Sequence, residues 1–223
     1  LVRFFVRRNL TDTPPTRDLI SLFMNNISDI NAKEYTAAAV TAAIEQKLVG
    51  ASATDEEFRR KLEGPIYEEN TGATRFILCA LAEKDMTRES MVDLWKVKNN
   101  SQFTWTIEHI FPQGERIPDE WVTMMAGGDK EKAKELQQSH VHKLGNLTIS
   151  GFNSQLGNQS FMKKRDRTDH AGRPIGYRNG LKLNEDLARA SGWSVAQIDA
   201  RTKKLVDQAM ELFKLQQGGA ARA

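Results

Sequence analysis

Three of the four histidines in this 223-residue chain lie near residues whose types suit phosphodiester hydrolysis. His109 directly follows Glu108, and His140 and His142 come later, shortly before a Gly-Asn-Leu run. This reaction needs an activated water, a cation on the phosphate and stabilisation of the departing oxygen. A neutral imidazole suits the first task, because its ordinary pKa of about 6.5 lets it accept a proton. Carboxylate and amide oxygens, as in Glu108 and the nearby Asn side chains, suit a hard ion such as Mg²⁺.

Two short strands are predicted to carry these residues. Residues 102–111 alternate strictly in parity and are rich in aromatic and β-branched side chains, which is typical of a strand, and Pro112 stops the run. Adjacent strand residues point to opposite faces, so Glu108 and His109 can converge on one ion only if the chain bends or bulges before Pro112. Residues 144–149 predict the second strand.

Helical periodicity and capping residues dominate the rest of the chain, which favours a mainly helical fold. The expected helices lie on both sides of the two strands and also between them. In chain order they open at Thr13-Pro14, cover 37–49, follow a capping box at Thr54, cover 74–82 and 87–95, occupy part of 118–138, cover 153–165, and close the chain in two segments, the last starting near Ser194.

The composition is that of an ordinary soluble protein. Hydrophobic residues make up 39% and charged residues 27% of the chain, and no apolar run approaches the roughly 18 residues of a membrane span. The one cysteine, Cys79, lies in an apolar run and cannot form an internal disulfide. It therefore favours a buried thiol and a cytoplasmic location.

The charge is unevenly distributed. The net charge is only +3, but residues 161–182 hold seven Lys or Arg against two acids, a local excess of five. Taken alone, such a stretch is more often a solvated surface. Beside residues suited to phosphodiester chemistry it becomes a candidate phosphate-contacting surface.

Taken together, the motifs resemble those of a known nuclease family. Residues 107–113 (Ile-Glu-His-Ile-Phe-Pro-Gln) and 142–148 (His-Lys-Leu-Gly-Asn-Leu-Thr), followed by Asn153, Asn158, Phe161 and Lys164, resemble the C-terminal nuclease domain of GmrSD-type modification-dependent restriction enzymes. The related domain of phosphorothioate-sensing Ssp systems looks similar, and both belong to the HNH, or His-Me finger, superfamily. The resemblance implies a mainly α fold with a small ββα-metal (HNH) element embedded between helical segments. It also implies a Mg²⁺- or Mn²⁺-dependent DNA endonuclease of a restriction or anti-phage system.

The resemblance implies roles for individual residues as well. His109 would be the general base, Glu108 the acidic metal ligand, and Asn146 the residue that holds the His-bearing loop. Asn153 would be the second metal ligand, with Asn158 as the competing candidate and otherwise a substrate contact. DNA contacts or bracing of the site are implied for four further residues: His142, Lys163, Lys164 and Arg165.

The expected organisation places the nuclease core between helical segments. An α-helical subdomain is expected at 1–98, the core at 99–166, a linker and C-terminal helices at 167–216, and a disordered tail at 217–223. The opening Arg-Arg-Asn-Leu at 7–10 resembles the exit from a ParB-like sensor domain. Recognition of modified DNA is therefore expected in such a domain, of the same protein or of a partner subunit. Nicking or double-strand cleavage, and a homodimer, remain open.

Two other classes of function are also open. A catalytically weak DNA-binding or assembly module would use the same helices, but it would not need an adjacent Glu and His. A zinc-dependent hydrolase is disfavoured, because the pair His140 and His142 has no cysteine nearby. Metal preference separates this last class from the nuclease, since oxygen ligands favour Mg²⁺ or Mn²⁺.

Overall fold

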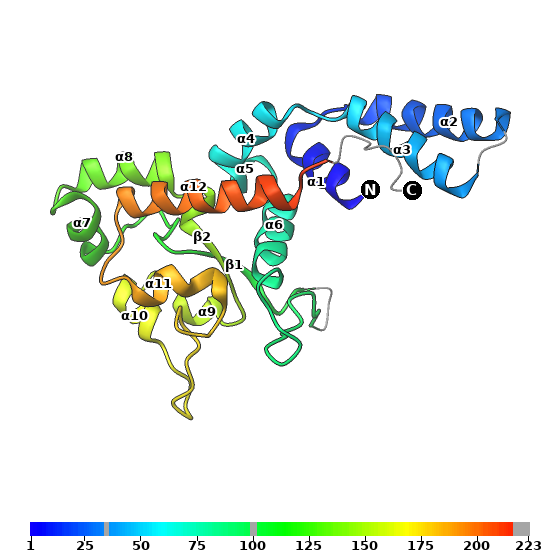
Figure 1. The fold of residues 1–223 in the computed structure, drawn as a ribbon. Coiled ribbons are helices and arrows are strands. Elements are labelled where there is room, and N and C mark those ends of the chain that lie inside the picture. The colour runs from blue at the N-terminus through cyan, green and yellow to red at the C-terminus, as the bar shows by residue number, and fades with distance from the viewer. Residues whose placement is uncertain (34–35, 99–101, 216–223) are drawn as a thin grey trace. The chain divides into compact units, whose positions relative to one another are not determined.

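The computed structural model describes residues 1–33, 36–98 and 102–215, which are mainly helical (Figure 1). The described residues contain one small sheet, in which β1 (Thr106–His109) pairs with β2 (Leu147–Ser150) in antiparallel register. Thr106 lies opposite Ser150, and His109 lies opposite Leu147. The expectation of a mainly helical fold around two short strands is thereby confirmed. None of the described helices is long and apolar enough to cross a membrane.

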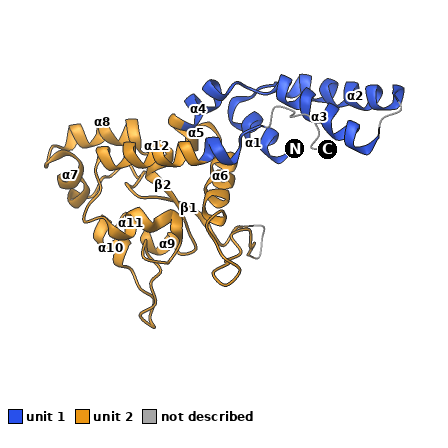
Figure 2. Cartoon of the chain, viewed as in Figure 1, with its two compact units in different colours: residues 1–62, 209–223 blue, residues 63–208 orange. Residues whose placement is uncertain are grey.

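The chain divides into two compact units (Figure 2). Unit 1 comprises residues 1–62 and 209–223, and unit 2 comprises residues 63–208. The boundary thus falls at residue 62 rather than at 98. The reason is that α6 (Thr71–Glu83), which precedes the strands in sequence, packs against β2. All the candidate site residues lie in unit 2. The predicted tail at 217–223 lies outside the described residues.

Unit 1 is helical in its described part. A buried arginine, Arg7, fastens its first helix: the guanidinium pairs with Asp55 at 2.8 Å, donates to the Ala53 carbonyl at 2.8 Å and lies over the Phe58 ring. The N-cap half of the predicted capping box is confirmed, since the Thr54 hydroxyl accepts from the backbone N–H of Glu57 at 3.1 Å. The elements are α1 (Val2–Thr11), α2 (Thr16–Ala32), α3 (Ala37–Ala51) and α4 (Asp55–Glu63).

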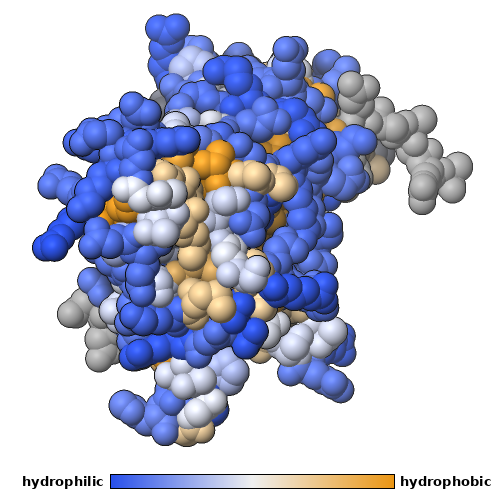
Figure 3. Space-filling view, turned by 90° about the vertical axis from the view of Figure 1, so that its left-hand side faces the viewer, coloured by the Kyte–Doolittle hydropathy of each residue, from blue (hydrophilic) through white to orange (hydrophobic). Residues whose placement is uncertain are grey.

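In unit 2 the helices surround the small sheet, and the core contains several aromatic side chains. The Phe161 ring stacks on Trp193 with centroids 5.7 Å apart, and Phe111 packs on Trp121 at 5.4 Å. Figure 3 shows a face of the molecule that is hydrophilic around its rim and carries a band of more hydrophobic residues down its middle. Besides α6, the helices are α5 (Ile66–Glu69), α7 (Asp119–Ala126), α8 (Lys130–His140), the 3-10 turn η2 (Leu144–Asn146), α9 (Asn153–Leu156), α10 (Phe161–Asp166), the 3-10 turn η3 (Lys182–Asn184), α11 (Glu185–Arg189) and α12 (Val195–Leu212).

The predicted helix at 87–95 is wrong. The hydroxyl of Ser90 accepts from the backbone N–H of Thr87, and the carboxylate of Asp93 accepts from that of Trp95. Short polar side chains that bond nearby backbone groups compete with a helix in this way. Of the three residues expected on its core face, Leu94 is buried, whereas Met91 is 72% exposed and Trp95 is 37% exposed. Cys79, in α6, is fully buried as predicted, and burial raises the pKa of its thiol to about 11.

Three further elements are shorter than predicted. The second strand, expected at 144–149, covers only 147–150, because residues 144–146 form the turn η2. The first strand covers only 106–109 because its partner β2 is four residues long, so little of the predicted run 102–111 has anything to pair with. The predicted helix at 153–165 is broken into α9 and α10 by Gly157, whose φ of 45° lies in the left-handed region. The break turns the chain between the two residues proposed as alternative metal ligands, Asn153 and Asn158.

Candidate active site

The end of β1 brings Glu108 and His109 to a single pocket. The pairing of β1 with β2 is regular, so no bulge turns the two side chains to the same face. The Glu108 carboxylate meets Lys164 and Tyr177, and the His109 ring meets His142 and Tyr67. Both residues line one pocket because β1 ends at His109 and the chain leaves the sheet before Pro112. The resulting cavity has a volume of about 120 Å³. This cavity, here called the motif pocket, is lined by Ile107, Glu108, His109, Pro112, Gln113, Asn153, Gly157 and Asn158.

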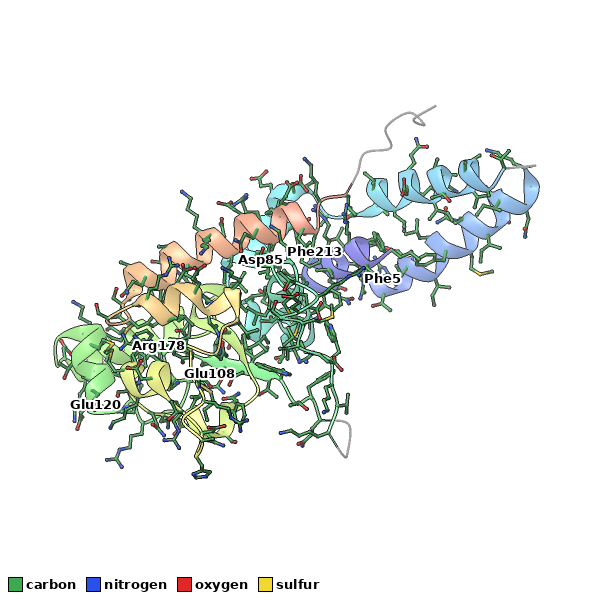
Figure 4. The ribbon with its side chains drawn as sticks, turned by 60° about the horizontal axis from the view of Figure 1, so that its bottom comes forward. Phe5, Asp85, Glu108, Glu120, Arg178 and Phe213 are labelled. Carbon is green, nitrogen blue, oxygen red and sulfur yellow. The ribbon has the colours of Figure 1, made fainter. Side chains whose placement is uncertain are left out.

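The motif pocket gathers four of the residues predicted from the sequence. Glu108 and His109 are buried at the end of β1, Asn153 is half-buried at the start of α9, and Asn158 is exposed just beyond Gly157. In Figure 4, Glu108 lies within unit 2 beside the strands. Residues that carry an imidazole, a carboxylate and amides thus line one small cavity, although Asn153 lies more than 40 residues after Glu108 and His109 in the chain.

Asn146 does not line the pocket but holds the chain that carries His109. Its Oδ1 accepts from the backbone N–H of Phe111 at 2.9 Å and from the Trp193 indole at 3.2 Å. Its Nδ2 donates to the carbonyls of Phe111 and Val141, both at 3.0 Å. The side chain is fully buried. Asn146 is therefore a clasp between the segment after β1 and the turn before β2.

His109 and His142 form an imidazole pair. His109 Nε2 lies 3.3 Å from His142 Nδ1, and either nitrogen can donate, depending on the tautomer. The ring of Tyr67, from α5, stacks on His142 and meets His109 edge-on, with centroids 5.3 Å and 4.6 Å away. Burial lowers the pKa of His109 to about 3, and the nearby His142 and Lys164 act in the same direction. The His109 imidazole is therefore neutral across the physiological range.

Glu108 is engaged in a buried ion pair. Lys164 Nζ, from α10, donates to Glu108 Oε1 at 2.7 Å, and the Tyr177 hydroxyl donates to the same oxygen at 3.3 Å. Burial raises the pKa of Glu108 and lowers the pKa of Lys164, and each partner opposes the shift of the other. Burial also keeps the pKa of the Tyr177 phenol well above its ordinary value, so this hydroxyl remains a donor.

Two predicted DNA contacts need correction. Lys164 is 0% exposed at its side chain and Arg165 is buried, so neither can reach a DNA backbone. Arg165 instead pairs with Asp166 at 2.7 Å and donates to the Ala190 carbonyl. Lys163, the neighbour of both, is 64% exposed and pairs only loosely with Glu120, at 3.6 Å. Figure 4 shows Glu120 at the outer edge of unit 2.

Much of the predicted basic surface is neutralised locally. Arg178 pairs with Asp166 at 2.9 Å, and Arg173 pairs with Asp169 at 2.7 Å. Surface pairs of this kind are weak and screened by salt. The local excess of charge in 161–182 therefore overstates how much positive charge is free to meet a phosphate.

The donors at the motif pocket fit a hard divalent cation. Asn153 Nδ2 donates to the Ile107 carbonyl at 2.6 Å and to the Thr106 hydroxyl at 3.2 Å. These bonds fix the amide, so its Oδ1 is left to accept or to coordinate. In the described part of the chain, no three His, Cys, Asp or Glu side chains gather to hold a metal. A cation here would therefore rely on amide oxygen besides Glu108, as Mg²⁺ can, because it keeps several waters.

Four residues around the site escaped the sequence analysis: Tyr67, Tyr177, Trp193 and Arg201. Arg201, in α12, is buried and donates to the carbonyls of Gly145 and Leu147 at 2.8 Å and 2.7 Å, on both sides of Asn146. The sequence predicts Trp193 as a core aromatic side chain but does not connect it with the site. Tyr67, Tyr177 and Arg201 lie outside the motifs, and nothing in their local sequence points to the site.

A larger cavity, of about 560 Å³, lies beside α7 and α8. It shares only Asn158 with the motif pocket, and its charged lining mixes both signs: Glu115, Arg116, Asp119, Lys130, Glu131 and Lys134. A polyanion gains little from such a surface. The smaller motif pocket is therefore the better candidate, because it holds the groups that can do chemistry.

A known protein family matches most of this chain. The model of the GmrSD restriction endonucleases, C-terminal domain, matches residues 52–208. The match covers the whole of unit 2 and includes every residue of the motif pocket. No match was found among curated proteins.

Proposed function

Because the chain belongs to the family of GmrSD restriction endonuclease C-terminal domains, we propose that it is a metal-dependent DNA endonuclease of the HNH type. In this proposal β1, β2 and α9 form the ββα-metal element. DNA is the substrate, and a ParB-like sensor domain, in the same protein or in a partner subunit, selects modified DNA.

One observation carries the proposal: the residues that line the motif pocket include one with an imidazole, one with a carboxylate and one with a fixed amide. His109 supplies the first, Glu108 the second and Asn153 the third. A module that only gripped DNA would gain nothing from burying an imidazole beside a carboxylate, since burying such groups costs free energy. Hydrolysis of a phosphodiester uses all three groups.

His109 is proposed to accept the proton of the attacking water. Its low pKa keeps it unprotonated, so the ring always has a lone pair to offer. When His109 Nε2 donates its proton to His142 Nδ1, that lone pair sits on Nδ1. In this reading Tyr67 and His142 hold the imidazole in its tautomer and orientation, while the Asn146 clasp fixes the backbone behind it.

Glu108 and Asn153 are proposed to hold the divalent cation, Mg²⁺ or Mn²⁺, with Asn158 as the alternative to Asn153. When bound, such an ion neutralises charge on the scissile phosphate and stabilises the departing oxygen. Lys163, which is exposed on α10, is the remaining candidate for a DNA-backbone contact among the three predicted basic residues at 163–165.

The test is cleavage of supercoiled plasmid with Mg²⁺, Mn²⁺ or EDTA, comparing wild type with His109→Ala and His170→Ala. His170 is a matched control, because it is an exposed histidine. Metal-dependent nicking or linearisation should fall at least ~100-fold in His109→Ala and stay unchanged in His170→Ala. Cleavage by His109→Ala at the wild-type rate would contradict the assignment of the base. If nothing cuts, the same comparison is made with the sensor-containing protein on modified DNA, and failure there would favour the DNA-binding module.

A further inference from the structure

Lys164 occupies the interior of the site as a fixed cation. Besides Glu108, its Nζ donates to the carbonyls of His109 at 2.8 Å and of Ile110 at 3.1 Å. An ammonium has three N–H donors, so these three acceptors satisfy it fully. The amine therefore braces the end of β1 from behind, at the two residues where the chain leaves the sheet.

The backbone of Lys164 is held as firmly as its side chain. Its N–H donates to the Ser160 carbonyl at 2.9 Å, and its carbonyl accepts from the N–H of Tyr177 at 3.3 Å. Gly176 passes so close that a Cβ there would overlap the Lys164 carbonyl oxygen. The ammonium is thus a built-in part of the pocket wall and not a mobile arm.

This arrangement changes the charge that an entering cation meets. Among the eight residues that line the motif pocket, Glu108 is the one Asp, Glu, Lys or Arg, and His109 is neutral; Lys164 balances the charge of Glu108 at 2.7 Å. The other polar lining groups, on Asn153, Asn158 and Gln113, are neutral amides. A divalent cation entering the pocket without DNA therefore finds oxygen donors but no net negative charge to hold it.

We infer that Lys164 makes metal binding depend on DNA, because it cancels the charge of Glu108 and leaves the scissile phosphate to supply the negative charge that retains the cation. Lys164 is a positioning residue in this account and touches neither substrate nor water. The inference rests on the proposed function, since it assumes that Glu108 is a metal ligand. It explains why a carboxylate in a small pocket is paired with a buried lysine.

The first experiment measures Mn²⁺ binding without DNA, from the loss of the free-ion signal in electron paramagnetic resonance. Wild type is compared with Lys164→Met, which keeps the length of the side chain and removes its charge. Lys163→Met is the matched control, because it removes the same charge from an exposed position of the same helix. Even at an effective dielectric constant of about 20, a neighbouring ammonium repels a divalent ion strongly, so Lys164→Met should bind Mn²⁺ at least ~10-fold more tightly. Lys163→Met should bind as wild type does, and equal affinity in all three proteins would overturn the inference.

A second measurement does not depend on the folding of Lys164→Met. Mn²⁺ affinity is measured for the His109→Ala protein, which is chosen to prevent cleavage, with and without a short DNA duplex. The affinity should rise at least ~10-fold with DNA, since the phosphate adds the missing charge. Mn²⁺ binding that is equally tight with and without DNA would contradict the inference about Lys164 but leave the proposed function standing. Absence of Mn²⁺ binding under both conditions would instead overturn the proposed metal-dependent function, and the inference with it.

Discussion

Replacing Asn146 by alanine should be among the most damaging single substitutions in unit 2. The side chain is fully buried and makes four hydrogen bonds, two as acceptor and two as donor. Three of its four partner groups belong to the backbone of Phe111 and Val141, and the fourth is the indole of Trp193. Alanine leaves all four groups buried without a partner.

The expected cost follows from those four bonds. A hydrogen bond contributes about 1 kcal/mol net, and a buried polar group left without a partner costs about 1–3 kcal/mol. Four bonds therefore amount to about 4 kcal/mol or more. Small domains are stable by only about 5–15 kcal/mol, so Asn146→Ala should come close to unfolding unit 2.

Urea denaturation followed by tryptophan fluorescence measures this cost, and Trp193 reports directly from the clasp. The matched control is Asn158→Ala, because Asn158 is an exposed asparagine of the same unit and should change the free energy of unfolding by less than ~0.5 kcal/mol. A loss below about 1 kcal/mol in Asn146→Ala would refute the claim that this side chain clasps the loop.

Two other predictions concern stability. Burial lowers the pKa of His109 from 6.5 to about 3, so between these values the unfolded chain holds a proton that the folded chain does not. The stability linked to His109 is therefore complete above about pH 6.5 and falls by about 2 kcal/mol by about pH 5. Denaturation at the two pH values should show this loss in wild type and a smaller one in His109→Asn, and equal losses would contradict it. Gly145→Ala would place a Cβ 2.6 Å from the backbone nitrogen of Thr202, so it should cost about 1–3 kcal/mol in the same assay, whereas Gly192→Ala, at a glycine with open space around it, should cost less than about 1 kcal/mol.

The order of elements around the site could be predicted, because each has a local signal. Pro112 lies just beyond the first strand, Thr54 caps the start of α4, and α7 and most of α8 fall within residues 118–138. The helix at 87–95 could not be excluded, because apolar spacing alone does not show that Ser90 and Asp93 bond nearby backbone groups instead.

The orientation of single side chains was harder to predict. Lys163 and Lys164 are neighbours on a helix of six residues, and nothing local says which one faces the interior. Lys164 is the one that faces the interior, because it neutralises the carboxylate of Glu108, which lies 56 residues away in the sequence. Tyr67 and Arg201 were missed for the same reason, since their contacts with the site come from tertiary structure and not from a motif.

The hydrogen bonds from Trp193 and Arg201 to the turn at Asn146 have a consequence for how the enzyme is made. Ribosomes release a chain from its first residue to its last, so both side chains emerge well after the pocket residues that they support. We expect a nascent chain that ends before residue 201 to lack a settled pocket. We therefore expect ribosome-bound chains to lack nuclease activity until nearly all of unit 2 has been synthesised.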